Sequence, residues 1–232
     1  MKIKKLISAL VLGSMLVGLS GCNITDFSAE NLLRPPKAVG DEAEIEQLIA
    51  KTADSGYTLK YPKNGKFRSA IIMTDLDGND SNEAVAFFRN SAETSSVHML
   101  VMYSKDNSWE IASDNIFETT DIDSVDFADL TGNGKAEIIV NSTTYTPNVG
   151  KLSCYSYSEG KTTEVGSGQS CSSFVTGDFD NDGTSEIMSL VLYTTENEAL
   201  ASMLDYNEDS KSLYAKAMAN MDPNVVKYKN IA

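Results

Sequence analysis

Three acidic loops that share one spacing are the part of this sequence best suited to chemistry. They span residues 75–83, 129–137 and 178–186, and in each the first Asp is followed eight residues later by a Glu. A Tyr follows 28 residues after the same Asp in all three cases. Alternate side chains of such a loop present oxygen atoms to one point, and calcium takes six to eight oxygen ligands. The spacing therefore predicts a repeated site for a hard divalent cation, Ca²⁺.

The predicted ligands occupy positions one, three, five and nine of each loop. They are Asp75, Asp77, Asn79 and Glu83; Asp129, Thr131, Asn133 and Glu137; and Asp178, Asp180, Asp182 and Glu186. Glycine at position six allows the left-handed backbone that closes the turn. Gly134 and Gly183 meet this need, and Asp80 replaces glycine in the first loop, although aspartate tolerates that conformation better than most residues.

The three loops are not expected to bind equally. The third carries four carboxylates, the first carries three among its predicted ligands, and the second keeps only Asp129 and Glu137 as charges. Affinity should therefore fall in the order third, first, second. The alternative for any one loop is a turn that hydrogen-bonds to itself and needs no ion. For the second loop that alternative is favoured.

The segments around the loops are predicted to be short β-strands. Each loop lies between two apolar runs, and two further runs follow, separated by a polar turn. The first Asp residues of successive loops are 54 and 49 residues apart. A period near 50 with four strands per period is typical of propeller blades. We therefore predict an all-β fold, a partial β-propeller of three to four blades made of four-stranded antiparallel repeats.

The repeats are expected to fill residues 56–232. The units cover about 60–115, 116–168 and 169–220, and the start of a further unit covers 221–232. Before them, residues 41–55 are predicted to form a short helix, because Ile45, Leu48 and Ile49 recur at helical spacing. Asp41 and Glu44 have the spacing of a capping box. Residues 22–40 contain Pro35-Pro36 and are predicted to be an extended tether.

Residues 1–21 have the pattern of a signal peptide. Three Lys precede an apolar run over residues 6–19, which is too short to be a comfortable membrane span. The run ends at Leu19-Ser20-Gly21-Cys22, which resembles the bacterial lipobox. The resemblance implies cleavage before Cys22 and attachment of lipid to its sulfur. The protein would then be anchored to the cell membrane on its extracytoplasmic face. An uncleaved anchor and ordinary secretion are the alternatives.

The acidic loops, set between strands and repeated in register, resemble those of the FG-GAP and VCBS families of integrin-like propellers. The resemblance covers about residues 60–232 and rests on the Asp-x-Asp-x-Asp-Gly pattern, since the Phe-Gly and Gly-Ala-Pro signatures are not seen. It implies calcium bound between two strands of each blade. With Leu32-Leu33-Arg34-Pro35-Pro36-Lys37, the chain is also similar to lipoproteins of Firmicutes that carry such repeats.

Residues outside the loops are assigned structural roles. Tyr103, Tyr157 and Tyr206 should be repeated packing residues whose hydroxyl groups reach water. Cys154 and Cys171 are 17 residues apart. In an exported protein they are a candidate disulfide if they lie on neighbouring strands, and otherwise two half-buried thiols.

Composition narrows the classes of function. The formal net charge of −14 argues against nucleic acid, which selects basic surfaces. His98 is the single His and lies in an apolar run, and no phosphate-binding or dinucleotide motif is found. We therefore expect a non-catalytic, surface-anchored binding or scaffold module for an unspecified protein or glycan. The alternatives are a carbohydrate-active or other hydrolytic enzyme on a propeller scaffold, and a structural subunit of a surface complex.

Overall fold

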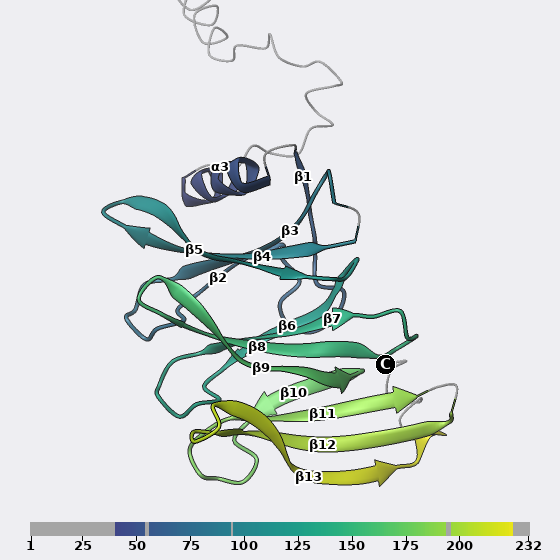
Figure 1. Cartoon of the computed structure of the whole chain (residues 1–232). Helices are drawn as coiled ribbons and strands as arrows, with labels where there is room; N and C mark the ends of the chain where they lie inside the picture. Colours follow the sequence, from purple (N-terminus) through teal and green to yellow (C-terminus); the bar gives the residue numbers. More distant parts are fainter. Residues whose placement is uncertain (1–39, 54–55, 94, 194–195, 225–232) are drawn as a thin grey trace, which may run out of the picture. The chain divides into compact units, whose positions relative to one another are not determined.

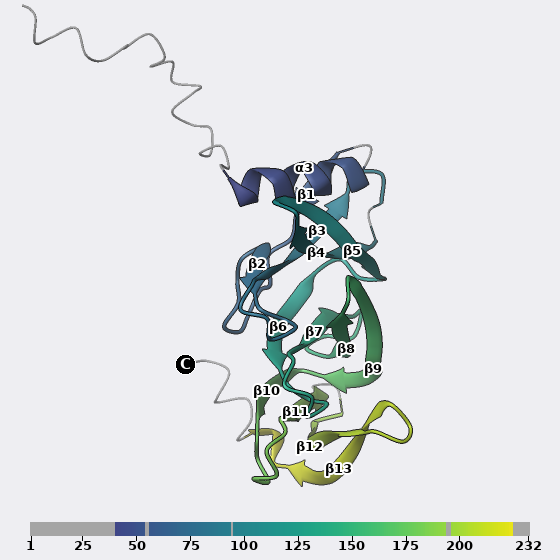
Figure 2. The same ribbon diagram turned by 90° about the vertical axis from the view of Figure 1, so that its left-hand side faces the viewer.

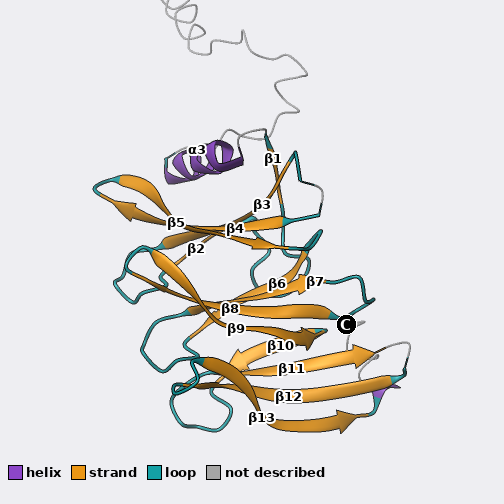
Figure 3. Ribbon diagram, viewed as in Figure 1, coloured by secondary structure: helices purple, strands orange, loops and turns teal. Residues whose placement is uncertain are grey.

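The computed structural model describes residues 40–53, 56–93, 95–193 and 196–224. In this part of the chain, helix α3 (Asp41–Ala53) precedes thirteen strands that form three antiparallel sheets (Figures 1 and 3). The predicted signal peptide, Cys22, the tether to residue 39 and the segment 225–232 lie outside the described residues. The all-β class, the short helix and the antiparallel repeats are confirmed, and the propeller arrangement remains a prediction.

Each sheet corresponds to one repeat of the sequence. The first contains β1 (Tyr57–Leu59), β2 (Ile71–Thr74), β3 (Glu83–Asn90), β4 (Val97–Lys105) and β5 (Ser108–Phe117). The second contains β6 (Ile122–Ala128), β7 (Glu137–Thr143), β8 (Gly150–Ser158) and β9 (Lys161–Cys171). The third contains β10 (Ser173–Gly177), β11 (Glu186–Tyr193), β12 (Glu198–Asn207) and β13 (Ser212–Met221).

The first sheet has five strands rather than the four expected. Strands β1 and β2 pair with successive parts of the same edge of β3, with Leu59 opposite Phe88 and Ile71 opposite Ala86. Between them the chain leaves the sheet at residues 61–69, since Lys60 and Ala70 still hydrogen-bond to Phe87 of β3. This excursion runs beside the second sheet, where the N–H groups of Lys63 and Asn64 donate to the carbonyls of Ile122 and Asp123 at 3.2 and 2.7 Å. The edge of β3 is therefore paired with two separate strands, because the segment between them hydrogen-bonds to the second sheet.

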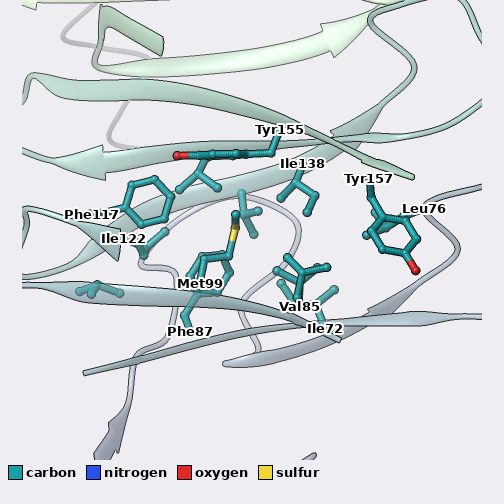
Figure 4. Close-up of a cluster of buried hydrophobic side chains, with 14 residues drawn as sticks. Ile72, Leu76, Val85, Phe87, Met99, Phe117, Ile122, Ile138, Tyr155 and Tyr157 are labelled. Carbon is teal, nitrogen blue, oxygen red and sulfur yellow. The ribbon is translucent and has the colours of Figure 1, made fainter. Parts of the chain in front are cut away.

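Successive sheets lie face to face (Figures 1 and 2), and apolar side chains fill the space between them. The core between the first and second sheets holds Phe87 and Met99 from one side and Ile138 and Tyr155 from the other (Figure 4). The core between the second and third holds Ile139 with Ile187, among others. Because Ile138 and Ile139 are neighbours in β7, their side chains serve opposite faces. The middle sheet is therefore apolar on both faces, and the apolar run Ile138-Ile139-Val140 of β7 serves both.

The outer face of the first sheet is covered by helix α3. Ile45 and Ile49 of the helix are fully buried in a cluster with Phe88 and Leu100. The expected capping box does not describe the start of this helix. Asp41 is already helical, and the carbonyl of Gly40 accepts the N–H groups of Ala43 and Glu44 at 3.1 and 3.3 Å. Gly40 can hold this position because its φ is +64°.

The repeated tyrosines pack as expected. Tyr157 is buried between the first two sheets, and Tyr103 and Tyr206 are partly buried against the two cores between sheets. The Tyr103 hydroxyl donates to Glu110 at 2.6 Å.

The disulfide proposed for Cys154 and Cys171 is not formed, and both are buried free thiols. The two residues do lie on neighbouring strands, but the register separates them. Cys154 is opposite Gly166, whereas Cys171 is opposite Gly150. Four residues along a strand amount to about 13 Å, and a disulfide requires Cα atoms within about 7 Å.

Candidate metal centre

The three acidic loops lie at the same end of their sheets and touch one another in sequence order. Each joins the first long strand of a repeat to the second: β2 to β3, β6 to β7, and β10 to β11. The N–H of Ala136 donates to the carbonyl of Leu76 at 3.1 Å, and the N–H of Ser185 donates to that of Asp129 at 2.8 Å. The loops therefore form a row that connects successive sheets.

One hydrogen-bond pattern builds all three loops. The carboxylate at position one accepts the N–H groups of positions five and six, as Asp178 does from Asp182 and Gly183, both at 3.1 Å. The Glu at position nine accepts the N–H of position two, as Glu186 does from Phe179 at 2.8 Å. The residue at position six has positive φ in every loop, and Asp80 adopts +65° where the others have glycine. Asp80 thus adopts, as expected, the left-handed conformation for which the other two loops use glycine.

The third loop brings together all four of its predicted ligands. Asp178, Asp180, Asp182 and Glu186 each place one carboxylate oxygen within 4.8 Å of the others. The first three are exposed, whereas Glu186 is 0% exposed. Its Oε2 bonds to Phe179, but the buried Oε1 accepts no hydrogen bond from the described residues. A buried carboxylate oxygen without a donor is costly, so this atom requires a partner that the described residues do not supply.

The first loop brings together its three predicted carboxylate ligands. Asp75, Asp77 and Glu83 each place one oxygen within 4.8 Å of the others. The Asn79 side-chain oxygen accepts the N–H of Ser81 at 2.7 Å. Here too one buried oxygen, Asp77 Oδ1, accepts no hydrogen bond from the described part of the chain.

The second loop satisfies its buried carboxylate internally. Glu137 Oε2 accepts the N–H groups of Leu130 and Thr131 at 2.8 and 3.2 Å, and Oε1 accepts the Thr131 hydroxyl at 3.2 Å. Asn133 accepts the N–H of Lys135 at 2.8 Å. The Thr131 hydroxyl at position three thus donates to the glutamate oxygen whose counterpart in the third loop, Glu186 Oε1, has no donor among the described residues. This is the self-bonded turn that the sequence favoured here.

Burial and hydrogen bonds shift the pKa values of several carboxylates in the loops. Burial raises the pKa of Glu83 against its hydrogen bond from Leu76, and the charges of Asp77 and Asp75 add to the rise. Burial likewise raises the pKa of Glu137, against donors from Leu130 and Thr131. Hydrogen bonds from Thr184 lower the pKa of Asp182. A positive charge placed among the first-loop carboxylates would favour their ionised forms.

A lysine at the third loop was missed by the sequence analysis. Lys216 of β13 pairs with Asp180 Oδ2, and it also donates to Asp205 at 2.9 Å. These hydrogen bonds raise the pKa of Lys216 above its ordinary value. The ammonium group therefore already neutralises part of the acidic cluster, and it competes with any ion for one oxygen of Asp180. Lys216 and Asp180 are 36 residues apart in the sequence, and their contact depends on the pairing of β12 with β13. No local sequence pattern could therefore predict it.

His98 lies away from the loops, in β4. Its ring is buried and stacked on Phe88 with centroids 4.8 Å apart. Nδ1 is 2.9 Å from both oxygens of Asp114, and Nε2 is 3.2 Å from Glu93. The histidine is thus a residue of strand β4 whose ring is held between two carboxylates.

Comparisons with known proteins add no assignment: no protein-family description matches the sequence, and no curated protein matches it. Within the described residues, the helical segments are too short or too polar to cross a membrane.

Proposed function

We propose that the chain is a calcium-binding repeat lipoprotein, anchored through Cys22 and acting as a non-catalytic binding or scaffold module outside the cytoplasm. The observation that carries the calcium proposal is the unpartnered, fully buried Oε1 of Glu186 within a group of four converging carboxylates. The first loop repeats this arrangement with Asp77. Calcium is a hard cation that prefers such oxygens.

The residues that would hold the ion are Asp178, Asp180, Asp182 and Glu186 in the third loop, and Asp75, Asp77 and Glu83 in the first. The ion would place positive charge where several carboxylates meet and would be coordinated by their oxygen atoms. It would thereby hold each loop in one conformation. Since neighbouring loops are hydrogen-bonded to each other, locking a loop also stabilises the contact between sheets. The role proposed for calcium is therefore structural.

The propeller arrangement is part of the same proposal. Its support is the succession of sheets, each joined to the next by an apolar core and a row of loops. In this arrangement Leu76 and Leu130, at position two of their loops, are buried in the cores that join one sheet to the next.

Equilibrium dialysis with radioactive calcium tests the metal proposal on the full chain in detergent. We expect saturable binding at two loops, with the tighter event lost in Asp178→Ala and the weaker one lost in Asp75→Ala. Asp129→Ala is the matched control, because the second loop is satisfied internally, and it should leave the number of bound ions unchanged. Binding that is lost equally in all three variants, or in none, would argue against the assignment.

The lipid anchor is tested separately. With Cys22→Ser the chain should leave the membrane fraction and lose incorporation of labelled palmitate in growing cells. Unchanged membrane retention in this variant would count against lipidation at Cys22.

A second candidate function, a structural subunit of a larger surface assembly, is favoured by the outer face of the third sheet. Phe179 is the equivalent of Leu76 and Leu130, yet it is 45% exposed. Next to its loop, one row of register partners crosses the sheet with apolar side chains only: Val175, Met188, Met203 and Ala217.

The outermost members of this row, Val175 and Ala217, are exposed. Light scattering of the full chain should show an oligomer that Val175→Asp converts to a monomer if this surface is used in self-assembly. A monomeric wild type would remove self-assembly as its role.

A further inference from the structure

A polar cavity of about 950 Å³ lies at the opposite end of the sheets from the acidic loops. The second sheet fixes this direction: the acidic loop joins Ala128 to Glu137, whereas the cavity adjoins the far end of the same strands, where Ile122 pairs with Ser142. Three parts of the chain contribute to its wall. They are the excursion at residues 63–65, the ends of β6 and β7 with the segment 143–150, and the start of β10 with Leu192 of β11.

The lining is rich in groups that both donate and accept hydrogen bonds. Seven threonines or serines line it, together with three asparagines and two aspartates. Hydroxyl and amide groups of this kind can act as donors and acceptors at once. The apolar members are few: Phe174, Leu192, Val149 and Pro147. Binding sites for drug-like molecules are predominantly apolar, so the cavity suits a ligand covered with polar groups.

The charges in the wall are already compensated. Asp121 pairs with Lys60 and Lys63 at 2.5 and 3.1 Å. Asp123 accepts Asn64 on one oxygen at 2.9 Å, and Ser124 and Asn141 on the other at 3.0 and 3.3 Å. No amine in the lining is left to bind an anion, because Lys63 is the only one there and it is paired. A neutral ligand is therefore favoured over a phosphate or an acidic polymer.

Two features point to a ligand rather than to a solvent-filled gap. Asn141 is 1% exposed and lines the cavity, and its Oδ1 accepts no hydrogen bond from the described residues. Tyr145 lies between the lining residues Thr144 and Thr146, and its side chain is 96% exposed. A sugar can satisfy both features. Its hydroxyl groups donate hydrogen bonds to a buried acceptor that lacks a donor, and its C–H face packs on an exposed aromatic ring.

We infer that this cavity binds a neutral oligosaccharide. The volume falls within the range of about 300–1,000 Å³ for small-ligand sites, which suits a short glycan segment rather than a folded protein. The inference rests on the proposed binding function and gives its ligand class, but it uses none of the calcium ligands. The Asp123 carboxylate, held by three donors, orients Asn64 and Asn141 and forms the polar centre of the site.

The test is calorimetric titration of the full chain in detergent with cellohexaose, chitohexaose and mannohexaose, and with hexagalacturonate as the charged comparison. We expect at least one neutral hexasaccharide to bind more tightly than hexagalacturonate. Tyr145→Ala should weaken that binding about threefold to tenfold by removing a packing face, and Tyr145→Phe should retain it. Asp123→Ala should weaken it about tenfold or more, because hydrogen bonds to a charged group are the stronger ones.

Met218→Ala is the matched control, an exposed apolar residue on β13 that is not part of the cavity lining, and it should leave the dissociation constant unchanged. If Asp123→Ala fails to fold, the Tyr145 pair of variants decides the matter. Absence of binding to all three neutral sugars, tighter binding of hexagalacturonate, or equal binding by Tyr145→Ala and wild type would each overturn the inference. A chain that binds calcium but no sugar contradicts this inference alone, and a chain that binds sugar but no calcium contradicts only the calcium proposal.

Discussion

Replacing Glu186 by Gln tests whether this residue is a metal ligand or a carboxylate with a structural role only. Glu186 is fully buried, with one oxygen bonded to the Phe179 N–H at 2.8 Å and the other without a donor. Glutamine keeps the shape and one acceptor for Phe179, but it removes the charge and one oxygen ligand. Without calcium the variant should be at least as stable as wild type, because a buried, unpaired carboxylate oxygen is costly and a neutral amide is less so.

The size of the calcium effect follows from binding linkage. Extracellular calcium modules bind with dissociation constants on the order of 0.1–1 mM. A site of about 0.1 mM in about 1 mM free calcium stabilises the folded state by about 1.4 kcal/mol. For a domain of this size, that corresponds to a rise in melting temperature of about 3–6 °C. Glu186→Gln should remove this rise, so that only the additional, smaller rise contributed by the first loop remains.

Thermal unfolding followed by circular dichroism, with calcium and with a chelator, measures this rise. Glu137→Gln is the matched control, because the same substitution at the same loop position removes an internally satisfied carboxylate. It should lower the melting temperature in both conditions and leave the calcium-induced rise intact. Equal calcium-induced rises in wild type and Glu186→Gln would refute the reasoning, whatever the absolute stabilities.

Three further predictions concern charge, pH and thiols. Lys216→Met should tighten calcium binding at the third loop roughly threefold or more, because it removes a competing cation from Asp180; a weaker or unchanged calorimetric affinity would contradict this. The raised pKa of Glu83 means that its charged form is disfavoured in the folded state. In chelator, wild type should therefore lose stability relative to Glu83→Gln as the pH rises from about 4.5; urea unfolding at several pH values measures the difference, and a flat difference would count against it. Cys154 and Cys171 should both be alkylated in denaturant without reductant and should resist alkylation in the native state, since burial raises their pKa values, that of Cys171 to about 12; protection of both thiols in denaturant until reductant is added would show a disulfide.

The repeat made much of the fold predictable. Positions of the strands follow from the acidic loops, because a loop of fixed length between two apolar runs fixes where one strand ends and the next begins. Glu83, Glu137 and Glu186 each open the second long strand of their repeat, as the spacing indicated. Self-similarity over three units carried this information, and no single strand would have sufficed.

Contacts between distant segments could not be predicted in the same way. Strand β1 was missed because its three residues pair with an edge of β3 that is shared with β2. The sequence could not decide between a disulfide and two free thiols at Cys154 and Cys171, because the register of β8 and β9, with shifts near Leu152 and Cys154, decides which residues are opposite. Lys216 and the cavity lining depend on the same kind of long-range pairing. Each acidic loop is one continuous stretch of sequence and could be predicted, whereas the residues that contact it come from distant segments.

The most direct test of the calcium-centred account is calorimetric titration of the full chain with calcium, in wild type and in the double variant Asp178→Ala, Asp180→Ala. The account predicts a saturable binding event in wild type that disappears in the variant, with the weaker event at the first loop retained. No heat and no thermal shift with calcium in the wild type would contradict it.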